Sequence, residues 1–403
     1  MNTLRFACLL CAPLLGAPAN VFSQSALDQQ LRTAIERKDV PGVVVIAGNH
    51  KGVIYQRAFG MAEVAAVRPM TADAIFRLAS MTKPVTAVAA LQLIEERKLA
   101  LDDPAAKHLP ELANLMVFES FDAETGAYKL RPAASAITVR HLFTHTSGLG
   151  YPFTSTVLSK FKPREGETYP AGPLLFDPGT DWIYGTSTDQ LGKIVEKLSG
   201  KNLEAYFRER IFGPLGMNDT GYNVPTEKHA RVVNIHRRGT EGALTEQPRN
   251  SPQTATRFNG GGGLYSTAGD YLRFLLMLLH GGELGGARVL SNESVALMGQ
   301  NHIGSVGVRA AKSTQPNLSR DFTFVDDGRD KWGLGFQITT AAVVGKRSPG
   351  SLSWGGIDNT YFWLDPSRGV AGVIMMQFLP FADAKALGVY DTFERGVYQL
   401  LGK

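Results

Sequence analysis

The chain has 403 residues, of which 44% are hydrophobic and 20% charged, and its formal net charge is +5. This is the profile of a globular protein with a packed core, built as one large unit or two subdomains. Its lysines and arginines are scattered among acidic residues and form no basic stripe with interleaved aromatics, which argues against a nucleic-acid-binding protein.

Residues 1–23 are predicted to be a cleavable export signal. Arg5 makes the start positive, "FACLLCAPLL" is an apolar run of signal-like length, and Ala17 and Ala19 offer a small-residue cleavage site, with a second candidate after Ser23. The apolar run is too short to span a bilayer. The mature protein is therefore expected to be exported, periplasmic or secreted, with no stable membrane anchor.

The two cysteines, Cys8 and Cys11, both lie in this predicted signal. The mature chain would then have no disulfide, no thiolate nucleophile and no cysteine-ligated zinc. No cofactor is expected from any other motif.

Strands are predicted near both ends of the mature chain. After a helical pattern over residues 28–40, residues 43–60 fit two strands around a turn at residues 48–52. A helix is predicted from Pro84, which is tolerated in the first helical turn. Further strands are expected within residues 331–378, before a last helix over residues 385–401.

The middle of the chain has a different character. Residues 101–250 combine helical segments with long loops that contain proline and glycine, such as 150–181 and 224–256. We therefore predict an α/β domain made of residues 24–100 and 251–403, with a mainly helical insert, residues 101–250, bordering a cleft.

The stretch "FRLASMTKPV" places Ser80 and Lys83 three residues apart, so on a helix the two side chains share a face. A serine at a helix N-terminus lies near unpaired amides, and burial favours the neutral form of a nearby lysine, which can then accept the serine proton. The same residues could instead form an ordinary helix cap. The S-x-x-K pattern alone does not decide between a nucleophile and a cap.

Two further segments could complete such a site. Tyr184 stands in a loop just before a helical segment, where it could share protons with a serine–lysine pair or simply pack as a core aromatic. Gly355 and Gly356 interrupt a predicted strand, which indicates either a close backbone approach or a bulge. An exposed amide there could pair with the Ser80 amide as an oxyanion hole.

The sequence resembles the serine β-lactamase and DD-peptidase superfamily. The resemblance begins with "MTADAIFRLASMTKPVTAVAALQLIEERKLALDDPAAKHLPEL" and continues, in the same order as in the family, through "ITVRHLFTHTSGL", "FDPGTDWIYGTSTDQLG", "GGGGLYSTAGDYLRFLLMLL" and "SWGG". It covers nearly all of the mature chain. It implies an antiparallel sheet flanked by helices, with the insert beside it.

The resemblance also implies residue roles. Ser80 would be the nucleophile, Lys83 its proton acceptor or relay, and Tyr184 the general base and later acid. The backbone amides of Ser80 and Ile357 would form the oxyanion hole. Trp354, Gly355 and Gly356 would match the family's third motif and contribute to substrate binding.

Two motifs depart from the β-lactamase pattern. Tyr184-Gly185-Thr186 stands where Tyr-x-Asn is usual, and Trp354 stands where a Lys or His is usual. A tryptophan cannot pair with a substrate carboxylate. The Trp-Gly-Gly sequence is similar to that of family VIII carboxylesterases and related acyltransferases, which implies a more apolar pocket and uncharged acyl esters.

The expected function is thus that of a serine hydrolase that cleaves small-molecule esters through an acyl-serine intermediate. A β-lactamase or D-amino-acid peptidase acting on amides is the alternative within the same fold, and a non-catalytic penicillin-binding-like recognition protein is the alternative outside enzymes. A metal site is not expected, because His141 and His145 have no evident third ligand and no HExxH motif is present.

Overall fold

The computed structural model describes residues 23–249, 251–323 and 329–402. Apart from Ser23, the predicted export signal lies outside these residues. Ser23 is the N-cap of the first helix, α1 (Gln24–Glu36), where its side chain accepts a hydrogen bond from the Ala26 amide.

An eight-stranded antiparallel sheet forms the centre of the molecule. Its strands follow the spatial order β12 (Lys331–Trp332), β13 (Gln337–Ile338), β14 (Leu352–Gly356), β15 (Thr360–Asp365), β16 (Val370–Met375), β1 (Gly42–Asn49), β2 (Gly52–Glu63) and β3 (Arg68–Pro69). Strands from the two ends of the chain meet where Ile46 of β1 pairs with Val373 of β16. The predicted fold class, an antiparallel sheet flanked by helices, is confirmed.

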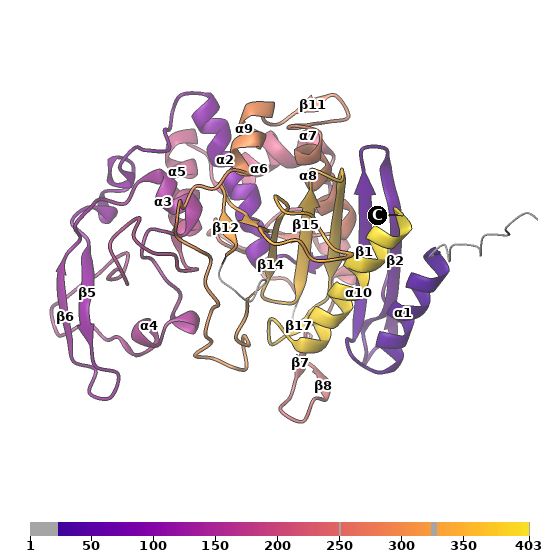
Figure 1. Ribbon diagram of the computed structural model, residues 1–403. Helices are drawn as coiled ribbons and strands as arrows, with labels where there is room; N and C mark the ends of the chain where they lie inside the picture. The colour runs from indigo at the N-terminus through magenta and orange to yellow at the C-terminus, as the bar shows by residue number, and fades with distance from the viewer. Residues whose placement is uncertain (1–22, 250, 324–328, 403) are drawn as a thin grey trace, which may run out of the picture.

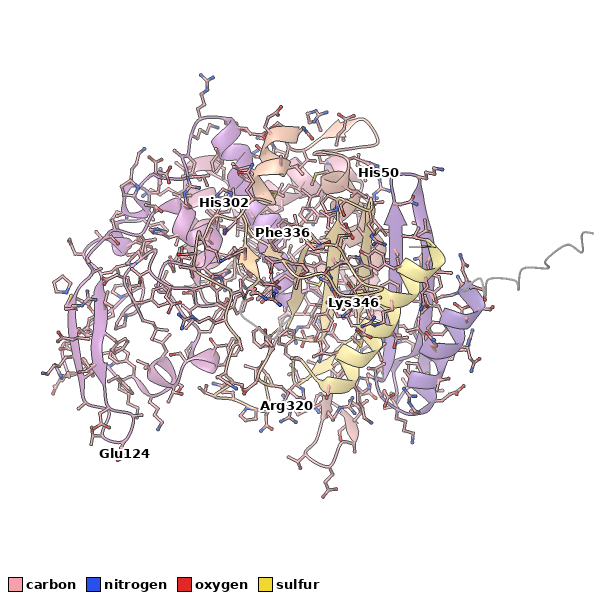
Figure 2. The ribbon with its side chains drawn as sticks, in the orientation of Figure 1. His50, Glu124, His302, Arg320, Phe336 and Lys346 are labelled. Atoms are coloured by element: carbon pink, nitrogen blue, oxygen red, sulfur yellow. The ribbon has the colours of Figure 1, made fainter. Side chains whose placement is uncertain are left out.

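Helices cover both faces of this sheet (Figure 1). Helix α1 and the C-terminal helix α10 (Ala384–Leu400) contact each other over β2 and β16, and α8 (Ala268–Leu279) packs against β1, β15 and β16. The central strands are continuous apolar runs such as "VVVIA" because they are buried on both faces. Figure 2 places Lys346 beside α10, where its Nζ lies 2.8 Å from Asp391 Oδ1.

Helix α2 (Thr82–Glu95) is buried over nearly its whole length. Its residues from Thr82 to Leu93 are all buried, so it has no polar face. It contacts η1 (Ala79–Met81) and α5 (Ser187–Ser199). Helix α2 therefore holds its first turn rigidly in the interior.

The remaining elements form the helical part and the short connecting sheets. They are β4 (Phe76–Arg77), η2 (Ala105–Lys107), η3 (Pro110–Leu112), β5 (Met116–Phe121), β6 (Tyr128–Pro132), α3 (Val139–Thr144), η4 (Pro152–Thr154), α4 (Thr156–Lys160), α6 (Leu203–Phe207), η5 (Arg208–Phe212), α7 (Gly213–Leu215), η6 (Thr226–Arg231), β7 (His236–Arg238), β8 (Leu244–Glu246), β9 (Tyr265–Ser266), β10 (Glu283–Leu284), β11 (Ala287–Arg288), α9 (Asn292–Met298) and β17 (Phe378–Leu379).

Three of these strands, β5, β6 and β7, were not expected from the sequence. The hairpin β5–β6 stands apart from the main sheet, with Glu124 at its tip (Figure 2). Strand β7 lies within the predicted insert, yet it pairs in parallel with β17 near the C-terminus. The segment 101–250 therefore contributes strands as well as helices, and it is joined to the C-terminal part by backbone hydrogen bonds. In the described part of the chain, no helix is long and apolar enough to cross a membrane.

Candidate active site

Ser80 lies in η1, at the entrance to α2. The preceding residue, Ala79, has φ +46°, a left-handed conformation that is unfavourable for a residue with a Cβ. The Leu78 amide donates to Leu264 O at 2.8 Å. This hydrogen bond joins the segment before Ser80 to the residue that follows the glycines at 260–263. Ser80 itself is partly exposed. The chain thus holds a strained turn that presents a serine at the N-terminal end of a buried helix.

Lys83 lies one helical turn after Ser80 and is 1% exposed. Its Nζ is 3.1 Å from Ser80 Oγ, 2.7 Å from Gly261 O and 3.3 Å from the Tyr151 hydroxyl. An amine that touches three oxygen atoms has no hydrogen-bonding capacity left for other partners. The predicted Ser80–Lys83 pair is therefore brought together in hydrogen-bonding geometry.

Tyr184 lies beside this pair, two residues before Thr186, the N-cap residue of α5. Its side chain is 4% exposed, and Lys83 Nζ lies 4.7 Å from the centroid of its ring. The Tyr184 hydroxyl accepts a hydrogen bond from Trp354 Nε1 at 3.2 Å. The structure thus places Lys83 against the face of the Tyr184 ring, and the phenolic oxygen is bonded to the indole rather than to Lys83.

Tyr151 is a site residue that sequence reasoning missed. Its hydroxyl lies 3.3 Å from Lys83 Nζ and donates to Asp189 Oδ2 at 3.4 Å. Burial, followed by the charge of Asp189, raises the pKa of Tyr151 well above its ordinary value, so this phenol stays protonated. Because residues 83 and 151 are far apart in the chain, no local spacing signals this contact.

Asp189 connects Tyr151 to the backbone that holds Lys83. Its Oδ1 accepts the Gly261 amide hydrogen at 2.8 Å, and Gly261 O in turn is bonded to Lys83. A Cβ at position 261 would lie 2.5 Å from Asp189 Oδ1, so only glycine fits there. No catalytic role was predicted for Asp189, and its contacts are those of a residue that positions others.

The end of β14 lies against the turn that contains Ser80. A Cβ at Gly356 would approach Leu78 O to 2.2 Å, which measures how closely the two backbones pass. Within the described residues, neither the Ser80 amide nor the Ile357 amide donates to a backbone or side-chain acceptor. Two amides left without acceptors at such a crossing are available to a developing oxyanion.

His145 packs against Tyr184 and Gly185. It is 1% exposed, and its Nδ1 accepts the Gly185 amide hydrogen at 3.4 Å, with its ring centroid 5.0 Å from that of Tyr184. Burial, followed by the charge of Lys83, lowers the pKa of His145 well below its ordinary value, so the ring is neutral. Over the described residues, no group of three or more His, Cys, Asp or Glu could hold a metal ion.

A cavity of about 530 Å³ opens beside Ser80. Its wall includes residues of the strand pair β4–β9, the glycines at 261–263, residues 232–235, and residues 248, 251–253 and 255. Trp354 is 3% exposed and lines no part of this cavity. The volume suits a small-molecule ligand, and Ser80 Oγ is at its wall.

A comparison with family models matches residues 27–392 to the model described as Beta-lactamase. Monacolin J acid methylbutanoyltransferase of Aspergillus terreus is 31% identical over 92% of this chain and 95% of its own. Lovastatin esterase of Penicillium rubens is 29% identical over 93% of this chain and 98% of its own.

Among solved structures, unliganded simvastatin synthase from Aspergillus terreus superimposes with a TM-score of 0.79 at 30% identity. The superposition covers 94% of this chain and 98% of that one. The fold over 94% of this chain is thus shared with simvastatin synthase.

Proposed function

Since the chain belongs to the beta-lactamase family and is a serine hydrolase-like enzyme, we propose that it cleaves carboxylic esters through an acyl-Ser80 intermediate. The observation that carries this proposal is the contact of 3.1 Å between Lys83 Nζ, buried in the first turn of α2, and Oγ of Ser80, which lines a cavity. We further propose that residues 1–23 direct export, so that the enzyme works outside the cytoplasm.

In the first step, Ser80 Oγ forms a bond to the ester carbonyl carbon while its proton passes to Lys83, relayed by Tyr184. The carbonyl oxygen becomes an oxyanion held by the amides of Ser80 and Ile357. The bond from the carbonyl carbon to the alkoxy oxygen then breaks, and the same proton is delivered to the leaving alcohol. The products of this half-reaction are the alcohol and acyl-Ser80.

In the second step, a water oxygen forms a bond to the acyl carbon while a proton from the water passes to Tyr184 and Lys83. The bond from the acyl carbon to Ser80 Oγ then breaks, and this proton is delivered to Ser80 Oγ, so the acid is released and the serine is restored. Tyr184 is assigned the relay because it stands at the position of the family's second motif, and its hydroxyl is held by Trp354 Nε1 beside Lys83. Tyr151 stays protonated and orients Lys83.

Transfer of the acyl group to another alcohol is the second candidate, and it is favoured by the similarity to a methylbutanoyltransferase. It needs the same acyl-enzyme, and an acceptor alcohol replaces water in the second step. The open cavity beside Ser80 leaves room for such an acceptor.

The test is hydrolysis of p-nitrophenyl butyrate, combined with mass spectrometry of the acylated peptide. We expect release of p-nitrophenol and a butyryl group on Ser80, both lost in Ser80→Ala and both kept in the control Ser120→Ala, which changes an exposed serine on β5. Adding an alcohol that accepts the acyl group would divert product from acid to ester if transfer is favoured.

An intact protein that neither releases p-nitrophenol nor reacts with a fluorophosphonate at Ser80 would contradict the proposal. Export is tested separately, by expressing the full chain and sequencing the N-terminus of the extracytoplasmic product. A mature form that still begins at Met1 and stays in the cytoplasm would contradict it.

A further inference from the structure

The cavity beside Ser80 has one charged side chain among the described residues that line it, and that side chain is Arg77. The rest of the wall consists of glycines, apolar side chains and neutral polar side chains such as those of Tyr222, Asn234 and Gln253. The wall therefore offers a ligand one cationic group, Arg77, which also lies near the buried carboxylate of Asp358.

The strand pairing explains why Arg77 faces the cavity. Arg77 on β4 stands directly opposite Tyr265 on β9 in antiparallel register, so the two side chains project to the same side. Both residues line the cavity, and Ser80 follows Arg77 by three residues. The guanidinium, the Tyr265 phenol and the nucleophile therefore share one wall.

The Arg77 guanidinium lies near one buried carboxylate, and its terminal N–H groups are open. Its Nε lies 3.5 Å from Asp358 Oδ2, and Asp358 is 1% exposed. Within the described residues, Nη1 and Nη2 of Arg77 donate to no acceptor, and the Arg77 side chain is 49% exposed. The guanidinium thus lies near one carboxylate and keeps its two terminal N–H groups available to a second.

We propose that Arg77 binds a carboxylate of the substrate, so that the preferred substrates are esters that carry an anionic group. This inference rests on the proposed esterase function and names the substrate class for the same site. It departs from the expectation of uncharged esters, which rested on Trp354. The cation missing from the third motif is supplied from β4, three residues before Ser80.

Matched ester pairs test this inference and also locate the carboxylate. On the alcohol side, 4-acetoxybenzoate is compared with its methyl ester. On the acyl side, the mono-p-nitrophenyl ester of adipic acid is compared with the p-nitrophenyl ester of methyl adipate. For each pair the measured quantity is the ratio of kcat/KM for the anionic ester to kcat/KM for the neutral ester.

We expect a ratio above one for at least one pair in the wild type, and a fall of about tenfold in that ratio in Arg77→Gln. Arg77→Lys should keep part of the preference for the anionic ester, because the lysine ammonium still provides a positive charge. The matched control is Arg257→Gln, which removes the same charge from an exposed position outside the cavity wall. The control should leave both ratios unchanged.

A second readout needs no turnover. In the wild type, 4-hydroxybenzoate should slow the labelling of Ser80 by a neutral fluorophosphonate at lower concentration than 4-hydroxybenzamide does, and Arg77→Gln should abolish the difference. If Ser80 is labelled and neutral esters are cleaved, but the ratios and the protection do not depend on Arg77, the inference is wrong while the esterase function stands. If Ser80 reacts with nothing, the proposed function fails, and this inference fails with it.

Discussion

The indole Nε1 of Trp354 donates a hydrogen bond to the hydroxyl of Tyr184 at 3.2 Å. The third-motif position, which provides a cation in β-lactamases, thus provides a neutral N–H donor here. Because Trp354 is 3% exposed and outside the cavity wall, its polar atom serves Tyr184 rather than a substrate carboxylate. This hydrogen bond fixes the orientation of the Tyr184 phenol beside Lys83.

Replacing Trp354 with Phe should slow acylation and leave the fold intact. The substitution keeps an aromatic ring in the core and removes the donor to Tyr184, so we expect kcat/KM for p-nitrophenyl butyrate to fall about tenfold or more. Trp363→Phe is the control, because Trp363 is equally buried on the neighbouring strand β15 and lies outside the site. Equal activity in the two variants would remove the role assigned to the indole.

Lys83→Met should abolish the reactivity of Ser80. A methionine fills the buried space and cannot accept a proton, and general-base groups typically contribute about 10²–10⁴-fold. We expect fluorophosphonate labelling to slow by at least about a hundredfold, with near-UV circular dichroism unchanged. Lys193→Met, on the partly exposed side of α5, is the control. Labelling of Lys83→Met at the wild-type rate would exclude Lys83 as the base.

The two tyrosines around Lys83 should differ in their effect on catalysis. Tyr184→Phe removes the proposed relay oxygen, and we expect a loss of kcat of at least about a hundredfold. Tyr151→Phe removes a phenol that stays protonated and orients Lys83 through a contact of 3.3 Å, so we expect a loss nearer tenfold. Pre-steady-state acylation rates of the two variants test this difference. A larger loss in Tyr151→Phe than in Tyr184→Phe would assign the relay to Tyr151.

Local patterns were sufficient to predict the central pair of the site. Ser80 and Lys83 are one helical turn apart, so their contact depends on one helix alone, and the alternating and apolar runs at both chain ends predicted the strands of the sheet. Tyr184 was assigned to the site because it stands at the tyrosine position of the family's second motif.

What escaped prediction depends on contacts between distant segments. The contact of Tyr151 with Lys83, the Trp354–Tyr184 hydrogen bond and the position of Arg77 in the cavity wall each join elements that only the folded chain brings together. The hairpin β5–β6 was missed because its exposed strands lack a clear apolar alternation. The roles of Ile357 and Gly355 stay predictions, although the close approach of Gly356 to Leu78 agrees with them.

Acid should destabilise the fold partly through His236. Burial lowers the pKa of His236, and within the described residues neither ring nitrogen has a hydrogen-bond partner. The unfolded chain therefore takes up this proton first, so stability is lost as the pH falls below about 6.5, the ordinary histidine value. In His236→Leu, the loss of unfolding free energy between pH 7.5 and 5.5 should shrink by about 1 kcal/mol, as measured by urea denaturation. An unchanged pH dependence would contradict this assignment.

Ala79→Gly should make the protein more stable and less active. Ala79 has φ +46°, where glycine relieves a steric cost of about 1–2 kcal/mol, part of which is offset by the greater freedom of glycine in the unfolded chain. The same strain fixes the direction of the Ser80 amide and Oγ, so a more flexible turn should lower kcat severalfold. Ala382→Gly is the matched control, because Ala382 has φ +54° in a loop before α10. It should gain similar stability without losing activity, and a comparable activity loss in both variants would show that strain at Ala79 has no special part in positioning Ser80.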